Sequence, residues 1–288
     1  MFSARPKIPT PEIPAPRRRD NSHCQLADVR PAGGPRRDRR VLGVVGSESA
    51  AHGLADVPDQ LVHDRPVNDL WSDPSLLISQ CCGADVMHSY KNRLLPIATP
   101  EFAAPGCLGG SYCSMVVVAD DCPFDDVRDM RGAVAVINGA ESHSGMSSLR
   151  HLVSGRHVDG RFFASVKVSG SHLASLEMIR RREVDVAAID SVTLALIQRH
   201  LDGAMCGVRI LGQTYQAPAP PYVVRVSTPA DEIEKFRAAL VETFDDRSLT
   251  DCRETLLLKG VTRATQEDYW VLDDFQDYAD RVGYPVLQ

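Results

Sequence analysis

The sequence predicts an α/β fold with two lobes, a hinge and an interlobe cleft. From Leu54 onward, short apolar runs bounded by turn residues alternate with amphipathic stretches, which is typical of βα units around a mostly parallel sheet. Segments rich in Pro and Gly interrupt this alternation at 104–110 (APGCLGG) and at 214–221 (TYQAPAPP), where extended crossings are favoured over helix. A chain that crosses twice between α/β lobes leaves a cleft between them, which is a frequent position for a ligand.

The predicted elements follow this alternation along the chain. Apolar runs rich in β-branched residues predict strands at 75–79, 94–99, 114–119, 133–137, 163–168, 184–189, 208–212 and 222–226. Amphipathic stretches predict helices at 84–92, 144–154, 171–182, 191–200, 231–244, 249–258 and 274–281. We therefore expect residues 54–119 plus 214–288 to form one discontinuous lobe and residues 120–213 to form the other.

Residues 1–53 have a different composition from the rest of the chain. Pro, Arg and Gly dominate there, and no periodic apolar face is present, so the segment is expected to be disordered. A shifted reading frame is the other explanation. CQLADVR at 24–30 can be back-translated so that the next frame reads Ala-Ser-Leu-Pro-Met-Tyr-Asp, and GSESAAHG at 46–53 permits a short amphipathic helix in the same way.

Composition excludes several classes of protein. The formal net charge of -6 argues against a general nucleic-acid binder, which needs clustered Lys and Arg to neutralise phosphates. The eight Cys residues include no CxxC pair and no spacing suited to structural zinc, so neither a metal nor a cofactor is predicted. No window is long and apolar enough to span a bilayer, and no secretory signal precedes the fold. As written, the chain is expected in the cytoplasm.

The segment GAVAVINGAESHSGMSSLRHL at 132–152 contains the strongest candidate site. An apolar strand stops at an Asn-Gly turn, and Ser142, His143, Ser144 and Gly145 then open a helix. The spacing does not match Gly-x-Ser-x-Gly, which argues against a serine hydrolase. Free N–H groups and hydroxyls at a helix start can instead hold an oxyanion, although simple capping by Ser142 or Ser144 remains the alternative.

The same arrangement recurs at other strand ends. His172 follows the run FASVKV and a small-residue turn, and Asp190 ends the run VDVAAI directly before another predicted helix. The carboxyl ends of strands in an open α/β sheet are where ligands bind, although a capping role is the alternative for each residue. In the other lobe, Ser79 and Gln80 of SQCCG can donate to an anion or cap a helix, and Tyr112 at the hinge can reach a ligand or only pack.

Several of these motifs together resemble a known family. SQCCG, GGSYCSMVVVADD, the Asn and Ser positions of 138–145, GSH at 170–172 and VDVAAIDSVT are similar in order and spacing to the phosphate/phosphonate-binding family of ABC-transporter substrate-binding proteins. The resemblance spans roughly 56–285 and implies a type II periplasmic-binding-protein-like fold that closes on an oxyanion. It places ligand contacts at Ser79, Tyr112, Ser142, Ser144, His172 and Asp190. It also implies an ABC-transporter permease as partner, and periplasmic localisation if the true N-terminus differs.

The sequence thus predicts a non-catalytic binding protein for a small oxyanion such as a phosphonate, phosphate or phosphate ester. Two alternatives stay open. One is an enzyme on the same scaffold, similar to the pyrimidine-synthase relatives of type II binding proteins, with His172 and Asp190 as acid and base. The other is a binding protein that has lost its ligand.

Overall fold

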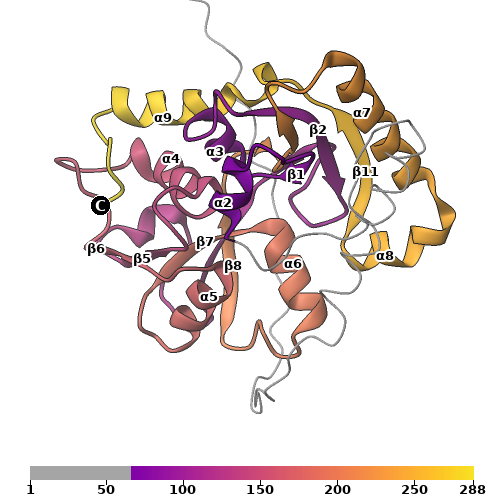
Figure 1. The fold of residues 1–288 in the computed structure, drawn as a ribbon. Helices are drawn as coiled ribbons and strands as arrows, with labels where there is room; N and C mark the ends of the chain where they lie inside the picture. The colour runs from indigo at the N-terminus through magenta and orange to yellow at the C-terminus, as the bar shows by residue number, and fades with distance from the viewer. Residues whose placement is uncertain (1–65) are drawn as a thin grey trace, which may run out of the picture.

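The computed structural model describes residues 66–288, which form two larger β-sheets with helices packed around them (Figure 1). The strands are β1 (Ser79–Gln80), β2 (Leu94–Phe102), β3 (Ser111–Tyr112), β4 (Ser114–Ala119), β5 (Val134–Ile137), β6 (Ser165–Val168), β7 (Val186–Asp190), β8 (Val208–Gln213), β9 (Ala217–Pro218), β10 (Tyr222–Arg225) and β11 (Leu258–Arg263). The expectations for residues 1–53 lie outside the described residues, as does the start of the first predicted lobe.

Helices occupy most of the connections between these strands. The α-helices are α2 (Val67–Ser72), α3 (Gly83–Met87), α4 (Ser148–Ser154), α5 (His172–Arg180), α6 (Ser191–His200), α7 (Ala230–Asp245), α8 (Thr250–Thr255) and α9 (Val271–Arg281). Shorter helical turns are η1 (Val127–Met130), η2 (His143–Ser147), η3 (Arg247–Leu249) and η4 (Glu267–Tyr269), of which η2 is a π-helix. Across residues 66–288, no helix combines the length and the apolarity needed to cross a bilayer.

The five-stranded sheet has the order β6-β5-β7-β4-β8. β5 pairs in parallel with β6 and β7, whereas β4 runs antiparallel to both of its neighbours. Every residue of β4 and β7 is buried, which explains their continuous apolar sequences. Alternate residues of β4 join separate cores, because Val116 and Val118 pack with α4 on one face while Met115 and Val117 pack with α5 and α6 on the other.

The four-stranded sheet has the order β1-β10-β2-β11, and all its neighbouring strands are antiparallel. The prediction of a mostly parallel sheet is therefore wrong for this part of the chain. β1 and β2 do run in the same direction, as a βα unit requires, but β10 lies between them in the opposite direction. β10 is the strand by which the chain returns after the second crossing, and α7 packs on this sheet through Ile233, Phe236 and Leu240.

Several element boundaries also differ from the predictions. The helix expected at 249–258 ends at Thr255, and an additional strand, β11, begins at Leu258. Leu257 has φ 59°, a left-handed conformation that reverses the chain without a glycine, so no turn residue marks the change. α3 ends at Met87, short of the expected residue 92, and the strand expected at 75–79 overlaps β1 (Ser79–Gln80) only at Ser79.

The two crossings lie side by side. β3 in the first crossing pairs antiparallel with β9 in the second, through Ser111 with Pro218 and Tyr112 with Ala217. These strands form a two-stranded ribbon that is separate from both larger sheets. The crossing segments are therefore hydrogen-bonded to each other.

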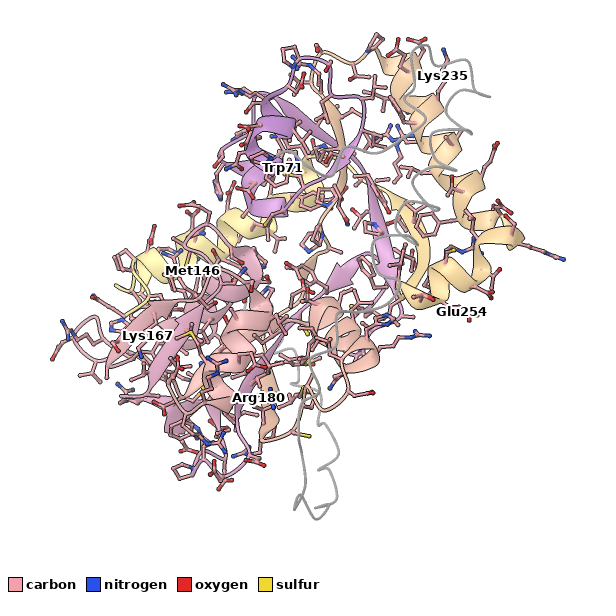
Figure 2. All side chains as sticks on the ribbon, turned by 60° about the horizontal axis from the view of Figure 1, so that its bottom comes forward. Trp71, Met146, Lys167, Arg180, Lys235 and Glu254 are labelled. Atoms are coloured by element: carbon pink, nitrogen blue, oxygen red, sulfur yellow. The ribbon has the colours of Figure 1, made fainter. Side chains whose placement is uncertain are left out.

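The C-terminal segment passes from one sheet to the other. In Figure 2 the pale yellow helix α9 lies between the region marked by Trp71 and the region marked by Met146, in agreement with its contacts to α3 and to α4. Beyond α9, Tyr284 and Leu287 join the core on the α4 face of the five-stranded sheet, and the N–H groups of Phe162 and Phe163 donate to the Gln288 carbonyl. This packing differs from the expectation that the chain up to residue 288 belongs to the first lobe.

Candidate anion-binding site

Three neighbouring strands of the five-stranded sheet end next to helix starts. β5 leads to η2, β6 leads to α5, and β7 leads directly to α6. Because β5, β6 and β7 run in the same direction, their carboxyl ends lie at one edge of the sheet. Helix N-termini expose unpaired N–H groups and the positive end of the helix dipole, so this edge favours an anion.

Ser142, Ser144 and His172 converge at this edge. The Ser142 hydroxyl caps η2 by accepting from the Gly145 N–H at 3.1 Å, and it lies 3.4 Å from the Ser144 hydroxyl. The Ser144 hydroxyl is 2.9 Å from Nε2 of His172, which is the first residue of α5. Sequence spacing thus predicted residues that the fold brings within hydrogen-bond distance across 28 positions of the chain.

Two residues support the turn that carries these serines. Asn138 lies so close to Gly145 that a Cβ atom at position 145 would be 1.8 Å from the Asn138 Oδ1 atom. Ser114 in β4 donates its hydroxyl hydrogen to the Ser144 carbonyl at 2.8 Å. Neither support was predicted. Asn138 was expected to form a turn and to belong to the motif shared with the family, and Ser114 was expected only as the first residue of a strand.

Tyr112 and Asp190 lie on the hinge side of the same site. Asp190 ends β7 opposite Ser114, and its carboxylate accepts from the Thr193 N–H at 2.7 Å as the cap of α6. Burial raises the pKa of Asp190. Burial and then the nearby Asp190 raise the pKa of Tyr112, while a hydrogen bond with Ser144 acts in the opposite direction, so the Tyr112 hydroxyl keeps its proton.

The imidazoles at this site are neutral. Burial lowers the pKa of His172 to about 4, and burial followed by the proximity of His151 lowers the pKa of His143 to about 4. The His143 ring stacks on Phe275. An anion at this site would therefore meet neutral hydroxyl and backbone donors, and not an imidazolium.

The Ser144–His172 pair lacks the third group of a catalytic triad. A serine nucleophile needs a base whose second nitrogen is held by an orienting partner, usually a carboxylate. Within residues 66–288, Nδ1 of His172 is buried without a hydrogen-bond partner, as is Oδ1 of Asn138. The geometry is suited to holding a ligand and not to activating a hydroxyl.

Ser79 and Gln80 have their hydrogen bonds elsewhere. The Ser79 hydroxyl accepts from Nε1 of Trp71 at 3.3 Å, and Gln80 donates from Nε2 to the Pro220 carbonyl at 3.0 Å. The structure brings together Tyr112, Ser142, Ser144, His172 and Asp190, and it records no contact between these five and the β1 pair. Cys82 is closer to these five residues than the β1 pair is, because the His143 N–H hydrogen-bonds the Cys82 sulfur and Cys82 interacts electrostatically with Tyr112.

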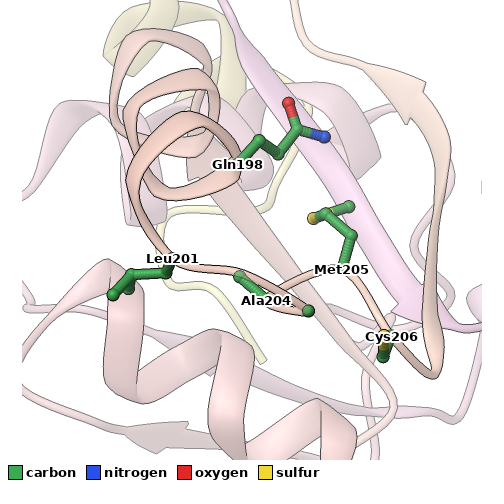
Figure 3. Close-up of a pocket in the computed structure, with 6 residues that line it drawn as sticks. Gln198, Leu201, Ala204, Met205 and Cys206 are labelled. Carbon is green, nitrogen blue, oxygen red and sulfur yellow. The ribbon is translucent and has the colours of Figure 1, made fainter. Parts of the chain in front are cut away.

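Two hollows in the described surface lie away from this site. One, of about 260 Å³, is lined by Gln198, Leu201 and residues 203–206 near the C-terminal end of α6 (Figure 3), whereas Asp190 caps the opposite end of that helix. The other lies beside α7 and β11, around Arg237. Among residues 66–288, no three side chains of His, Cys, Asp or Glu gather in a way that could hold a metal ion.

Solved structures show which fold the chain has. A binding-protein component of an ABC phosphonate transporter from Pseudomonas aeruginosa matches with a TM-score of 0.65 and 16% identity, over 84% of this chain and 81% of that one. PhnD1 from Prochlorococcus marinus, in complex with methylphosphonate, matches with a TM-score of 0.65 and 12% identity, over 84% and 93%. XAC2383 from Xanthomonas citri, bound to ATP, matches with a TM-score of 0.63 and 16% identity, over 85% of this chain and 94% of that one. The fold is that of the type II periplasmic binding proteins.

The family follows from the sequence itself. Residues 84–269 match the model of the periplasmic phosphonate substrate-binding proteins of ABC transporters, and the chain belongs to this family. Among curated proteins, none matches the sequence. Substrate-binding proteins of transporters hold their cargo without converting it, so the chain is a non-catalytic small-molecule binding protein. The findings give no better support to the pyrimidine-synthase-like alternative.

Proposed function

We propose that the chain binds a small phosphorus oxyanion, a phosphonate first of all, by closing two lobes around it. The observation that carries this proposal is the 2.9 Å contact between Ser144 and His172 at two neighbouring helix starts. Methylphosphonate is the ligand of the Prochlorococcus marinus relative, and it is the first ligand to test here.

The proposed roles follow from the donors and acceptors at the site. The hydroxyls of Ser142, Ser144 and Tyr112 donate to the oxyanion, together with N–H groups of the first turn of η2. Neutral His172 orients the Ser144 hydroxyl. The buried Asp190 carboxyl accepts from a protonated ligand oxygen.

The first lobe supplies the remaining proposed contacts. Ser79 and Gln80 precede the start of α3, and we propose that they meet the ligand from that side when the lobes close. The lobes are residues 120–213 and residues 54–119 plus 214–288, with 282–288 reassigned to the former because Tyr284 and Leu287 pack in its core. The partner is an ABC-transporter permease, and the place of action is the periplasm, as for the family.

Isothermal titration calorimetry with methylphosphonate, inorganic phosphate, sulfate and acetate tests the proposal. We expect methylphosphonate or phosphate to bind, and Ser144→Ala to weaken binding by about 0.5–3 kcal/mol, the range for a lost hydrogen bond. Ser175→Ala is the matched control, because Ser175 is also buried in the same part of the molecule but bonds Ser169 and not the site. If no oxyanion binds the wild type, the chain is a binding protein that has lost its ligand. If Ser144→Ala binds as well as wild type, Ser144 is only a structural residue.

A further inference from the structure

Phe275 connects α9 to the proposed anion-binding turn. Its ring stacks on His143, with 5.7 Å between the ring centroids and 15° between the planes. It also contacts His151 of α4, with 4.4 Å between the ring centroids and 34° between the planes. A single side chain of α9 is therefore in contact with both η2 and the helix that follows it.

The ring contacts extend from this centre to both crossings. The ring centroid of Tyr112, in the first crossing, lies 6.3 Å from the ring centroid of His143. The ring centroid of His151 lies 5.0 Å from that of Tyr215, which follows β8 in the sequence. It also lies 5.0 Å from that of Tyr278 in α9. The chain of rings thus links the two segments that would bend during closure with the turn that would hold the anion.

His143 is the residue that connects this series of ring contacts to the proposed site. It lies between Ser142 and Ser144 in sequence, so any rotation of its backbone moves both hydroxyls. Its side chain is 4% exposed, and stacking on Phe275 fixes its position. A second tether lies one turn later, where Gln276 of α9 donates from Nε2 to the Ser147 hydroxyl at 3.0 Å.

The turn needs such support because its own hydrogen bonding is irregular. In η2 the Ser142 carbonyl accepts from both Met146 and Ser147, in a five-residue π-helix, and π-helices are rare and occur mostly as single turns. We propose that Phe275 is a positioning residue for oxyanion binding, which holds η2 in its binding geometry through the His143 ring. This inference rests on the proposed function of Ser142 and Ser144.

Leucine at position 275 tests the inference, because it keeps an apolar side chain and removes the ring. Phe236→Leu is the matched control. Phe236 is a 2% exposed aromatic residue of α7, in the core of the four-stranded sheet, without contact to η2. For methylphosphonate, calorimetry of Phe275→Leu should show about two- to tenfold weaker binding, the range expected for one aromatic pair. Phe236→Leu should lower the midpoint of urea unfolding at least as much and leave the Kd unchanged, and Phe275→Tyr should restore binding.

A measurement without ligand separates this inference from the proposed function. Amide hydrogen exchange at Met146 and Ser147 should accelerate in Phe275→Leu and remain at the wild-type rate in Phe236→Leu. Wild type that binds neither methylphosphonate nor phosphate would overturn the proposed function, yet the exchange rates would still decide whether Phe275 holds the turn. Exchange at these two amides that is the same in Phe275→Leu and in wild type would overturn the positioning role. An affinity loss shared equally by both leucine variants would also overturn it.

Discussion

His172 is the residue whose protonation most directly affects the proposed site. It is neutral because the fold buries it. For the Ser144 hydroxyl to donate to the oxyanion, the Nε2–H group of His172 must donate to the Ser144 oxygen, so a second ring proton would go to Nδ1. That proton would charge the ring at an atom that has no partner within the described chain. The proposed site is therefore sensitive to acid, although none of its described side chains that would donate to the oxyanion is a cation.

The pH dependence of stability has a definite sign. In the unfolded chain the two histidines titrate near 6.5, whereas in the folded chain His172 and His143 titrate at about 4. Between these values the unfolded chain takes up protons that the folded chain does not. The free energy of unfolding should therefore fall as the pH is lowered from 6.5 toward 4, by up to about 1.4 kcal/mol per pH unit for each histidine.

Urea unfolding at pH 7, 6 and 5 checks this expectation. His172→Gln should show a shallower loss of stability than wild type, because one of the two groups is gone. Asp190 acts in the opposite sense, since burial raises its pKa, but it is common to both proteins and cancels in the comparison. Equal slopes for wild type and His172→Gln would contradict the assignment of a buried neutral imidazole.

Sequence patterns predicted some of these residues better than others. Ser142, Ser144, His172 and Asp190 follow apolar runs and open helices, and that local pattern decides their place at the sheet edge. Ser79 and Gln80 show the same pattern, but their strand has only two residues and their side chains bond Trp71 and Pro220. The direction of such side chains depends on distant partners, which a local pattern does not contain.

At the scale of elements, η2 depends on a glycine. Gly145 has no unusual φ, so its role is space and not backbone freedom. Gly145→Ala would place Cβ against Oδ1 of Asn138 and must displace either the Asn138 side chain or the turn. We expect a loss of about 1–3 kcal/mol in stability, as for other overpacked sites, together with weaker oxyanion binding.

Gly139→Ala is the control for this substitution. It lies in the same loop, but an added Cβ would have nothing within 4 Å. Asn138→Ala combined with Gly145→Ala should recover part of the lost stability, since it removes the obstructing amide. Thermal unfolding of the three variants measures the effect, and a Gly145→Ala protein as stable as Gly139→Ala would disprove the close packing.

The elements themselves were predictable where one periodicity dominates. α6 and α7 were predicted almost to the residue, because apolar residues recur there at helical spacing. β4 was predicted because it is a continuous buried run. The helix expected at 249–258 extended past the end of α8, and β11 was not predicted, because the Leu256–Leu258 run fits either structure. Strand direction was also beyond local pattern, since β10 is antiparallel only because the chain returns from the second crossing.

At the scale of the whole molecule, the cores of the two sheets are separate clusters. A ligand held between them would add contacts that exist only in the folded, closed chain. Methylphosphonate at 100 times its Kd should therefore raise the free energy of unfolding by about 2.7 kcal/mol. Urea denaturation with and without ligand measures this. Sulfate should have no such effect if Asp190 requires a protonated ligand oxygen, and equal stabilisation by sulfate would remove that role from Asp190.

The ribbon of β3 and β9 and the helix α9 together limit how the two sheets can move. The ribbon carries only two residue pairs, so it can bend but cannot lengthen. α9 is a stiff rod of 11 residues, about 16 Å long, and the chain beyond it is held in the core of the five-stranded sheet. The ribbon bends easily and α9 does not, and the two lie at separate places. Together they oppose sliding and twisting of one sheet against the other more strongly than rotation of the sheets about the ribbon. Each opening would then retrace the same arc, and every ligand admitted would be approached from one direction.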